Sequence, residues 1–317
     1  MTREEFIKQL EQLDEKGYPY KIEGDRIIVV GGFSSVELNS LISGVVFRNG
    51  WNVKLRSSSL PPGVEFENKG NVDLSALTSL PPGFHFKNDG GVYLSALTSL
   101  PSGVVFRNRG PVYLDSLTSL PPDVVFRNKG DVKLDSLISL PPGLEFKNGG
   151  DVELRNLTSL PPGFQFKNKG NVKLRNLTSL PPGVKFKNKG ENEWSGHIWM
   201  DSLISLSPGV VFSNSGLVSF DALTSLPPGV EFRNGDNVNL SALTSLPPGV
   251  IFKNKGYIWL RDLTSIPPGV VFSNEGDVKL PALIGEFNDF NKWKGNIKGV
   301  ASKRLLNKMI KDGVLER

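Results

Sequence analysis

Hydrophobic and polar positions along this chain repeat with a period of twenty residues. The repeated unit is Leu-Thr-Ser-Leu-Pro-Pro-Gly-Val-x-Phe-x-Asn-x-Gly-x-Val-x-Leu, in which x varies. The Phe of this unit occurs once in every copy and marks it. The period predicts a stack of small structural units rather than two globular domains. The twelve marking residues are Phe47, Phe66, Phe86, Phe106, Phe126, Phe146, Phe166, Phe186, Phe212, Phe232, Phe252 and Phe272.

One copy, from Val72 to Asn88, indicates how the unit folds. Val72-Asp73-Leu74 and Phe84-His85-Phe86 alternate apolar and polar residues, as short strands with one buried face do. Between them, Pro81-Pro82-Gly83 predicts a tight corner, because proline fixes φ and glycine tolerates positive φ. Asn88-Asp89-Gly90 predicts the second corner. Two strands and two corners account for one period.

The Asn that follows two residues after the Phe is expected to point inward. Asn68, Asn88 and Asn108 are examples. An unpaired buried amide costs about 1–3 kcal/mol. We therefore expect a ladder in which each Asn bonds either to the next Asn or to a corner backbone group.

The two ends depart from the repeat and predict caps for exposed strand edges. At the N-terminus, residues 3–15 form an amphipathic pattern behind a capping-box signature that begins at Thr2, which predicts a helix. Tyr20 to Ile22 and Ile27 to Val30 then predict a hairpin. At the C-terminus, a helix is expected from Ser302 to Gly313.

The predicted fold class is all-β, a two-sided β-solenoid of about twelve 20-residue coils with a cap at each end. We expect an N-terminal helix-hairpin cap at 1–33, the repeat solenoid at 34–284 with an insertion at 190–195, and a basic helical cap at 285–317.

Composition limits the classes of function. The chain has no cysteine, and no apolar run is long enough to span a membrane. Residues 1–17 are acidic and amphipathic, unlike a signal peptide. These features favour a cytoplasmic protein without membrane contact. The net charge is +5, and residues 146–190 alone carry +7.

Catalytic chemistry has few candidate residues. His85 and His197 lie several coils apart, so neither a metal cluster nor a histidine-based nucleophile is predicted. The glycines recur as corners and form no phosphate loop. Stacked acids such as Asp115 and Asp135 are expected to be solvated. The sequence predicts neither an enzyme nor a cofactor or metal site.

The outward position after each Phe is basic in nine of twelve copies, and we call this series the basic ladder. Like charges on neighbouring coils repel, so the ladder indicates either an anionic partner or a solvated edge that resists aggregation. The basic residues predicted to bind are Arg107, Arg127, Lys147, Lys167, Lys169, Lys173, Arg175, Lys187 and Lys189.

Exposed aromatic residues are the second candidate for binding. The outward position between the strand Val and Leu is Tyr93, Tyr113, Trp199 or Trp259 in four copies, and Trp194 lies in the insertion. Such side chains anchor interfaces or stack on bases. The alternatives are packing of Tyr93 on Tyr113, and a neutral insertion with Trp194 folded over the adjacent edge.

The run Leu77-Thr78-Ser79-Leu80-Pro81-Pro82, followed by Asn88, resembles the short leucine-rich repeats of bacterial proteins over about 250 residues. That family places its Asn three positions after the strand Leu, whereas Phe86 and Asn88 are two apart. Each copy here also has a second alternating strand, which favours a two-sided solenoid. The layout, with Trp293 to Ile297 and Ser302 to Met309 near the end, is similar to repeat proteins of phages and mobile elements.

Three functions remain open at this point. The first is a non-enzymatic rigid scaffold that binds an acidic protein through the basic ladder, with Trp194 and Trp199 as anchors. The second is binding of single-stranded nucleic acid or another polyanion, with Tyr93, Tyr113 and Trp259 as stacking surfaces. The third is a phage structural part or adhesin, which would place the protein in the virion. The sequence predicts no oligomeric state.

Overall fold

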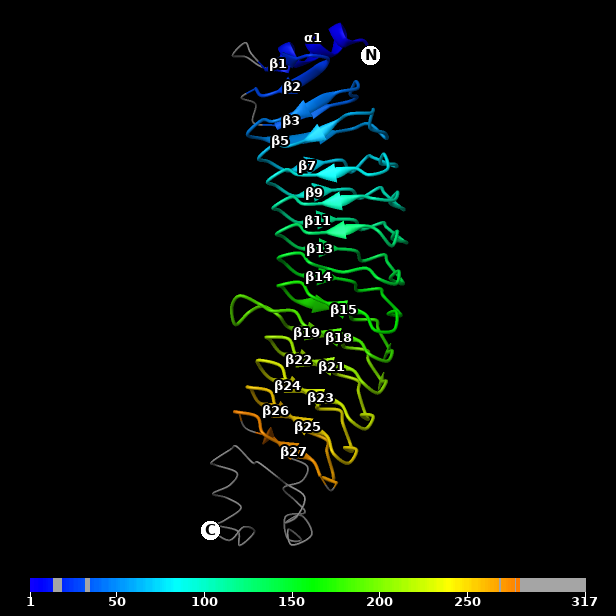
Figure 1. The fold of residues 1–317 in the computed structure, drawn as a ribbon, viewed down its shortest axis with the longest axis vertical. Coiled ribbons are helices and arrows are strands. Elements are labelled where there is room, and N and C mark those ends of the chain that lie inside the picture. Colours follow the sequence, from blue (N-terminus) through cyan, green and yellow to red (C-terminus); the bar gives the residue numbers. More distant parts are fainter. Residues whose placement is uncertain (14–18, 32–34, 268, 277, 280–317) are drawn as a thin grey trace. The chain divides into compact units, whose positions relative to one another are not determined.

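A computed structural model of the chain describes residues 1–13, 19–31, 35–267, 269–276 and 278–279. They form a nearly all-β solenoid of about twelve parallel coils with one N-terminal helix, as predicted (Figure 1). The chain divides into two units, Met1–Leu154 and Arg155–Arg317. The predicted cap at 285–317 lies outside the described residues. Among the described residues, no helix has the length and apolar character needed to cross a membrane.

The first unit begins with the predicted helix-hairpin cap. Helix α1 (Arg3–Leu13) is capped reciprocally, since Thr2 N–H donates to Glu5 Oε2 at 2.7 Å and Glu5 N–H donates to Thr2 Oγ1 at 3.2 Å. Strands β1 (Tyr20–Glu23) and β2 (Arg26–Val29) pair antiparallel. The last two residues of the predicted helix lie outside the described part of the chain. Within this unit α1 lies at the end of the stack beside β1 (Figure 1).

Two series of parallel strands build the coils of the first unit, and β2 joins the hairpin to one of them. We name the series the Phe sheet and the Val sheet after their inward residues. The Phe sheet continues through β4 (Val45–Phe47), β6 (Glu65–Phe66), β8 (His85–Phe86), β10 (Val105–Phe106) and β12 (Val125–Phe126). The Val sheet contains β3 (Ser35–Leu38), β5 (Asn52–Leu55), β7 (Val72–Asp73), β9 (Val92–Tyr93), β11 (Val112–Tyr113), β13 (Val132–Lys133) and β14 (Val152–Glu153).

The second unit repeats this arrangement and adds a short pair, β17 (Ser179–Leu180) with β20 (Ser205–Leu206). Its Phe sheet contains β15 (Gln165–Phe166), β18 (Lys185–Phe186), β21 (Val211–Phe212), β23 (Glu231–Phe232), β25 (Ile251–Phe252) and β27 (Val271–Phe272). Its Val sheet contains β16 (Val172–Lys173), β19 (Ile198–Trp199), β22 (Val218–Ser219), β24 (Val238–Asn239), β26 (Ile258–Trp259) and β28 (Val278–Lys279).

Neighbouring coils pair in register, so each residue stacks on its counterpart in the next copy. Phe86 pairs with Phe106 and Phe106 with Phe126, and the ring centroids of these pairs are 5.2 and 5.3 Å apart. The Phe, Val and Leu positions of the repeat are buried along both units. Burial of each such side chain contributes roughly 1.5–3 kcal/mol, which is why coils that cannot fold alone are stable when stacked.

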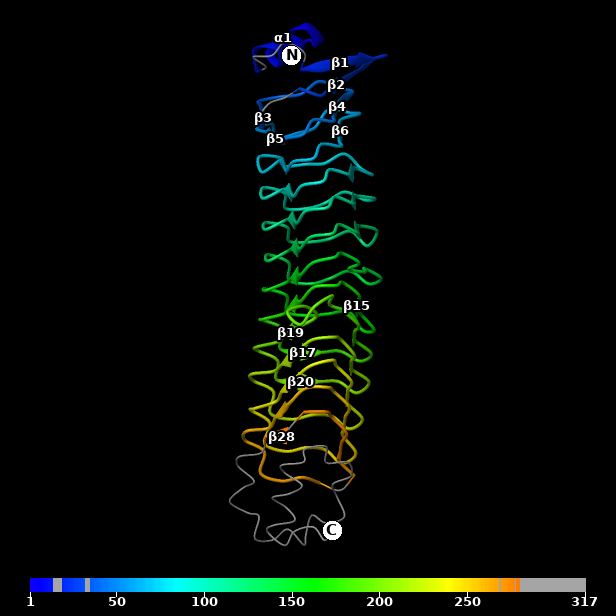
Figure 2. The ribbon, with the colours of Figure 1, turned by 90° about the vertical axis from the view of Figure 1, so that its left-hand side faces the viewer.

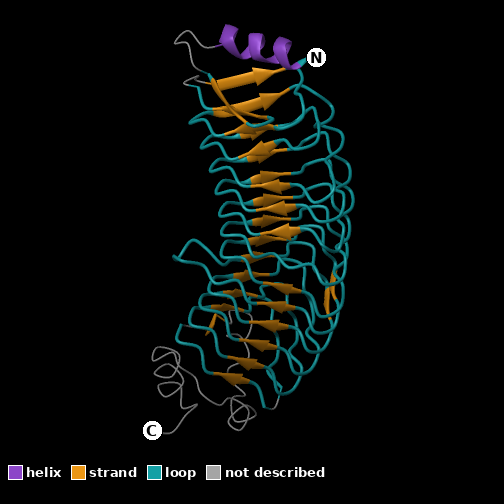
Figure 3. Ribbon diagram, turned by 45° about the horizontal axis from the view of Figure 1, so that its top comes forward, coloured by secondary structure: helices purple, strands orange, loops and turns teal. Residues whose placement is uncertain are grey.

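Corners occupy more of each coil than strands do, as the predominance of loop in Figure 3 shows. The Pro-Pro-Gly corner takes the predicted positive φ, for example 68° at Gly83 and 81° at Gly143. Asp123 replaces this glycine in one copy, and among the residues that the structure describes only glycines have positive φ. In Figure 2 the corners of successive coils lie above one another. A side chain added at one corner therefore lies beside the corner of the adjacent coil.

From Asn68 onward, the buried Asn of each copy bonds to corner backbone, which is one of the two predicted arrangements, whereas the side chain of Asn49 has no hydrogen-bond partner among the described residues. Asn128 Nδ2 donates to the carbonyl oxygens of Gly110, Gly130 and Asp131 at 3.3, 2.9 and 3.1 Å. The amide therefore ties its own corner to the corner of the preceding coil. The Oδ1 atom of this Asn has no hydrogen-bond partner, so the amides do not bond to one another.

A second side-chain ladder was not predicted. In several copies the residue before the strand Val accepts a backbone N–H from its counterpart in the next coil: Asn71 Oδ1 from Gly91 at 2.7 Å, and Asp131 Oδ1 from Asp151 at 2.7 Å. Gly91 has no side-chain acceptor, and its successor Pro111 has no N–H to donate. The sequence signal was the frequency of Asn and Asp at this position.

Candidate binding surfaces

The basic ladder lies where predicted, on the outer side of the Phe sheet in each unit. In the first unit, Arg107 N–H donates to the Phe86 carbonyl and Arg127 N–H to the Phe106 carbonyl, each at 2.9 Å. These bonds hold successive cations at the strand spacing of about 4.8 Å. All nine residues predicted to bind through charge are exposed except Lys173, which is half-buried.

Ion pairs neutralise much of the ladder. Lys147 pairs with Glu145 and Arg233 with Glu231, in each case across two residues on one strand face. Arg48 donates to Glu67 at 2.8 Å, and this bond raises the pKa of the Arg48 guanidinium. These pairs were not predicted, although residues two apart on a strand share a face.

The basic residues of the second unit are also engaged in several places. Lys169 Nζ lies 2.6 Å from Glu191 of the insertion, and Arg175 Nε lies 3.6 Å from Asp201. Burial raises the pKa of Asp201, and the nearby Asp221 carboxylate adds to the rise while Arg175 opposes it. Lys167 and Lys173 also have electrostatic partners. Part of the positive charge of residues 146–190 is thus balanced by nearby carboxylates.

Three ladder positions of the first unit stand apart. Lys87, Arg107 and Arg127 are exposed, follow the adjacent strands β8, β10 and β12, and form no ion pair within the described residues. We call these three residues the cation row. The next ladder cation, Lys147, is also exposed but is paired with Glu145.

A cavity of about 290 Å³ opens at the start of the cation row. Phe84 stands where most copies have Val, and its ring centroid lies 6.2 Å from that of Phe66 and 4.9 Å from that of Phe86. The Phe66 and Phe86 centroids are 6.4 Å apart, farther than in the other copies of this unit. The extra ring therefore accompanies a local opening between two coils.

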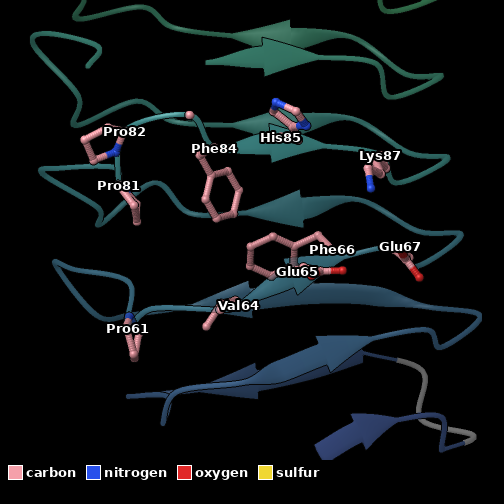
Figure 4. Close-up of a pocket in the computed structure, with 12 residues that line it drawn as sticks. Pro61, Val64, Glu65, Phe66, Glu67, Pro81, Pro82, Phe84, His85 and Lys87 are labelled. Carbon is pink, nitrogen blue, oxygen red and sulfur yellow. The ribbon is translucent and has the colours of Figure 1, made fainter. Parts of the chain in front are cut away.

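Charged groups rim this cavity. Figure 4 shows the Phe84 and Phe66 rings between the Pro81-Pro82 corner on one side and Lys87 and Glu67 on the other. The carboxylates on the rim are already paired, Glu65 with Arg26 and Glu67 with Arg48. Lys87 and the exposed His85 remain available to an incoming group. This cavity was not predicted, although Phe84 visibly replaces the usual Val of the repeat.

The predicted tyrosines pack on each other. The Tyr93 and Tyr113 ring centroids are 4.8 Å apart with planes inclined by 12°, which confirms the packing alternative. Burial raises the pKa of the Tyr113 hydroxyl, and Tyr93 adds to this effect. Both residues belong to the Val sheet, as does half-buried Trp259, which lies 6.5 Å from the Tyr257 ring. The tyrosines therefore do not share a sheet with the cation row.

The insertion forms a loop that projects from the second unit beside β19 (Figure 1). Trp194 is 76% exposed, so it does not fold over the adjacent edge as the neutral alternative required. Its N–H donates to Asn192 Oδ1 at 3.0 Å, and Gly190 N–H donates to Ser215 Oγ at 2.6 Å. Half-buried Trp199 lies on β19 and faces the same cavity as Trp194, together with Glu193, His197, Ser215 and Asp236.

The stacked acids make local contacts. Lys133 Nζ lies 3.6 Å from a carboxylate oxygen of both Asp115 and Asp135. Asp131 belongs to the backbone-bonding ladder described above. In the part of the chain that the structure describes, no group of three or more His, Cys, Asp or Glu side chains could hold a metal ion.

Comparison of the chain with protein-family models, curated protein sequences and solved structures finds no match. Its function is therefore inferred from its own residues and their arrangement.

Proposed function

We propose that this protein is a rigid, non-enzymatic scaffold that binds an acidic protein partner through the cation row. The observation that carries the proposal is the exposure of Lys87, Arg107 and Arg127 on adjacent strands without ion pairs among the described residues. At three other ladder positions, Arg48, Lys147 and Arg233, the chain supplies its own carboxylates. At the cation row a partner would supply them.

Electrostatic repulsion supports this assignment. Two unit charges about 5 Å apart in water repel by roughly 0.8 kcal/mol, so three stacked cations cost stability at each step. Carboxylates of a bound partner would replace that repulsion with attraction. They would also raise the association rate, which depends on the field of the unpaired charges.

The surroundings of the cation row favour a protein over a polyanion. Glu67 and Asp89 lie among the cations, and Asp89 pairs with Arg109 at 3.2 Å. A continuous negative polymer would meet these carboxylates, whereas a folded partner can place its acids opposite single cations. The cavity floored by Phe84 also suits a side chain, since buried apolar anchors carry much of the energy of protein interfaces.

We further propose the two-sided cross-section and the helical C-terminal cap that the sequence pattern indicates. The support for the cross-section is the alternation of Phe and Val sheets around each coil. The support for the cap is the need to cover a strand edge at the end of a solenoid.

The proposal is tested by affinity capture with a charge-reversed variant, Lys87→Glu/Arg107→Glu/Arg127→Glu. A matched control is Lys8→Glu/Lys21→Glu/Arg261→Glu, which changes the net charge equally at exposed positions off the row. We expect the wild type and the control to retain an acidic protein that the row variant loses, with all three showing the same circular dichroism. Equal capture by the row variant would refute the proposal.

Salt dependence separates the two kinds of partner. Binding of single-stranded nucleic acid by three cations should weaken about 20-fold between 50 and 200 mM salt. We expect no nucleic acid binding by the wild type even at 50 mM salt. Tight binding at low salt that the row variant lacks would favour the polyanion instead.

A further inference from the structure

Two departures from the repeat meet at the cavity beside the insertion. The insertion itself supplies Glu193 and Trp194. Asp236 takes a corner position that is Gly in both neighbouring copies, Gly216 and Gly256. Space at this position is small: a Cβ added to Gly216 would lie 2.7 Å from the Gly196 carbonyl carbon. Departures that disturb regular stacking are expected where a protein binds or reacts. We call this cavity, of about 670 Å³, the insertion pocket.

The corner N–H of Asp236 differs from those of its two neighbouring copies. Gly216 N–H donates to the corner carbonyl of the preceding coil at 3.2 Å, and Gly256 N–H does so at 3.3 Å. The Asp236 N–H makes no such bond in the described part of the chain. A carboxylate has therefore replaced a hydrogen-bonded glycine at the pocket edge.

The loop presents its tryptophan in an ordered way. Ser195 Oγ accepts from Asn192 N–H at 3.2 Å and donates to the Asn192 carbonyl at 3.0 Å, so the insertion is closed by its own hydrogen bonds. Lys169 ties Glu191 to the adjacent coil. An indole that is 76% exposed on a loop held at both ends is a preformed contact surface.

The polar groups of the pocket include both a hydrogen-bond donor and hydrogen-bond acceptors. His197 is only 9% exposed, and its Nδ1 accepts the Leu217 N–H at 2.8 Å, which places the proton of the neutral ring on Nε2. That Nε2–H has no acceptor among the described residues. The carboxylates of Glu193 and Asp236 form no ion pair there either. The pocket thus offers one histidine N–H donor, two anionic acceptors and two indoles.

These groups select a ligand by elimination. An anion would meet two carboxylates, and the lining contains no Lys or Arg. A cationic side chain would match the carboxylates but would leave the His197 N–H without an acceptor, which costs about 1–3 kcal/mol once water is excluded. A sugar ring has hydroxyls that both donate and accept, and C–H faces that pack on indoles.

We propose that the insertion pocket binds a neutral saccharide. Hydroxyls donate to Asp236 and Glu193 and accept from His197 Nε2–H, and the ring packs between Trp194 and Trp199. The cavity volume falls within the range of about 300–1,000 Å³ typical of small-ligand sites. This site is independent of the cation row.

The test is an array of immobilised neutral oligosaccharides of glucose, galactose, mannose and N-acetylglucosamine, probed with the full chain. We expect the wild type to bind at least one of them. Trp194→Ala and Asp236→Asn should each weaken that binding about tenfold, as expected when a central contact is lost. The control Trp51→Ala, at a tryptophan that is 46% exposed and outside the pocket, should bind as the wild type does.

Three results would overturn the proposal. One is the absence of binding to any of these saccharides, and another is equal binding by the pocket variants and the wild type. The third is pocket-dependent binding of a lysine-rich peptide with no saccharide binding, which would show that the ligand is cationic. Because Trp194 is exposed, its replacement should leave the fold unchanged, and matching thermal unfolding curves check this. Normal saccharide binding by the cation-row variant would show that the two sites are separate.

Discussion

At the scale of single residues, the buried Asn links each corner to the preceding one. Its amide nitrogen serves three carbonyl oxygens, as at Asn128, while its own oxygen stays unpaired. An apolar residue at this position would remove one donor from each of the three carbonyls, which also accept hydrogen bonds from other groups. The repeat therefore retains a polar residue in its core because the corners need an N–H donor there.

Replacement of Asn128 tests this role. We expect Asn128→Ala to lower the free energy of unfolding by about 1–3 kcal/mol, since the amide hydrogen bonds that link the two corners are lost. Asn128→Asp should cost more, because it places an acceptor against three acceptors. Denaturant unfolding measures both, and an Asp variant more stable than the Ala variant would contradict the assigned hydrogen bonds.

The sequence predicted the strand and corner residues but not the ion pairs or the insertion pocket. Period-two alternation and Pro-Pro-Gly sufficed for the strands and corners, because those signals are local. The ion pairs of Lys147 and Arg233 were missed because they depend on side-chain conformation. The meeting of Asp236 with the insertion was missed because it depends on which coils are neighbours. The sequence signal for this site was that Asn234-Gly235-Asp236 replaces the usual Asn-x-Gly of the repeat.

At the scale of the coil, the two corners use glycine for different reasons. Gly143 needs a φ of 81°, and a Cβ there would have no atom within 4 Å. At Gly90 the backbones of two coils lie close together, and a Cβ there would be only 2.4 Å from the Gly70 carbonyl carbon. The first constraint is conformational, and the second acts between neighbouring coils.

Alanine substitutions separate these constraints. Gly143→Ala should cost about 1–2 kcal/mol from left-handed backbone strain. Gly90→Ala should cost more and should raise amide hydrogen exchange in both coils that meet there, because backbone must move. Asp123→Ala is the control, since φ there is not positive. A Gly90→Ala variant as stable as the control would contradict the close packing.

The contact between the insertion and its neighbouring coil should respond to acid. The hydrogen bond from Lys169 holds the pKa of the Glu191 carboxyl below its ordinary value. Since the folded-state pKa is lower than the unfolded one, the contact stabilises the fold above the ordinary glutamate pKa. That contribution is lost as the pH falls through the lowered value.

An NMR titration of the Glu191 carboxyl measures this effect. The wild type should titrate below the ordinary glutamate range, and Lys169→Met should return the pKa to it. Identical Glu191 titrations in the wild type and the variant would show that the ion pair is absent in solution.

At the scale of the whole molecule, the repeat accounts for the fold and the departures from it account for the proposed sites. Phe84 opens the cavity beside the cation row, and the insertion with Asp236 forms the pocket in the second unit. Regular positions are committed to stacking, so binding residues are expected where stacking permits change. One surface is cationic and the other is acidic and aromatic, which assigns them different ligands.

The central claim is that an acidic protein binds at the cation row. A photo-activatable cross-linking residue at His85, which is exposed on the cavity rim, tests it most directly, with Ile204 as an exposed control in the second unit. After irradiation in cells, the account predicts His85-specific adducts whose cross-linked peptides belong to a protein and are rich in Asp and Glu. Adducts to nucleic acid, or the same adducts at both positions, would contradict it.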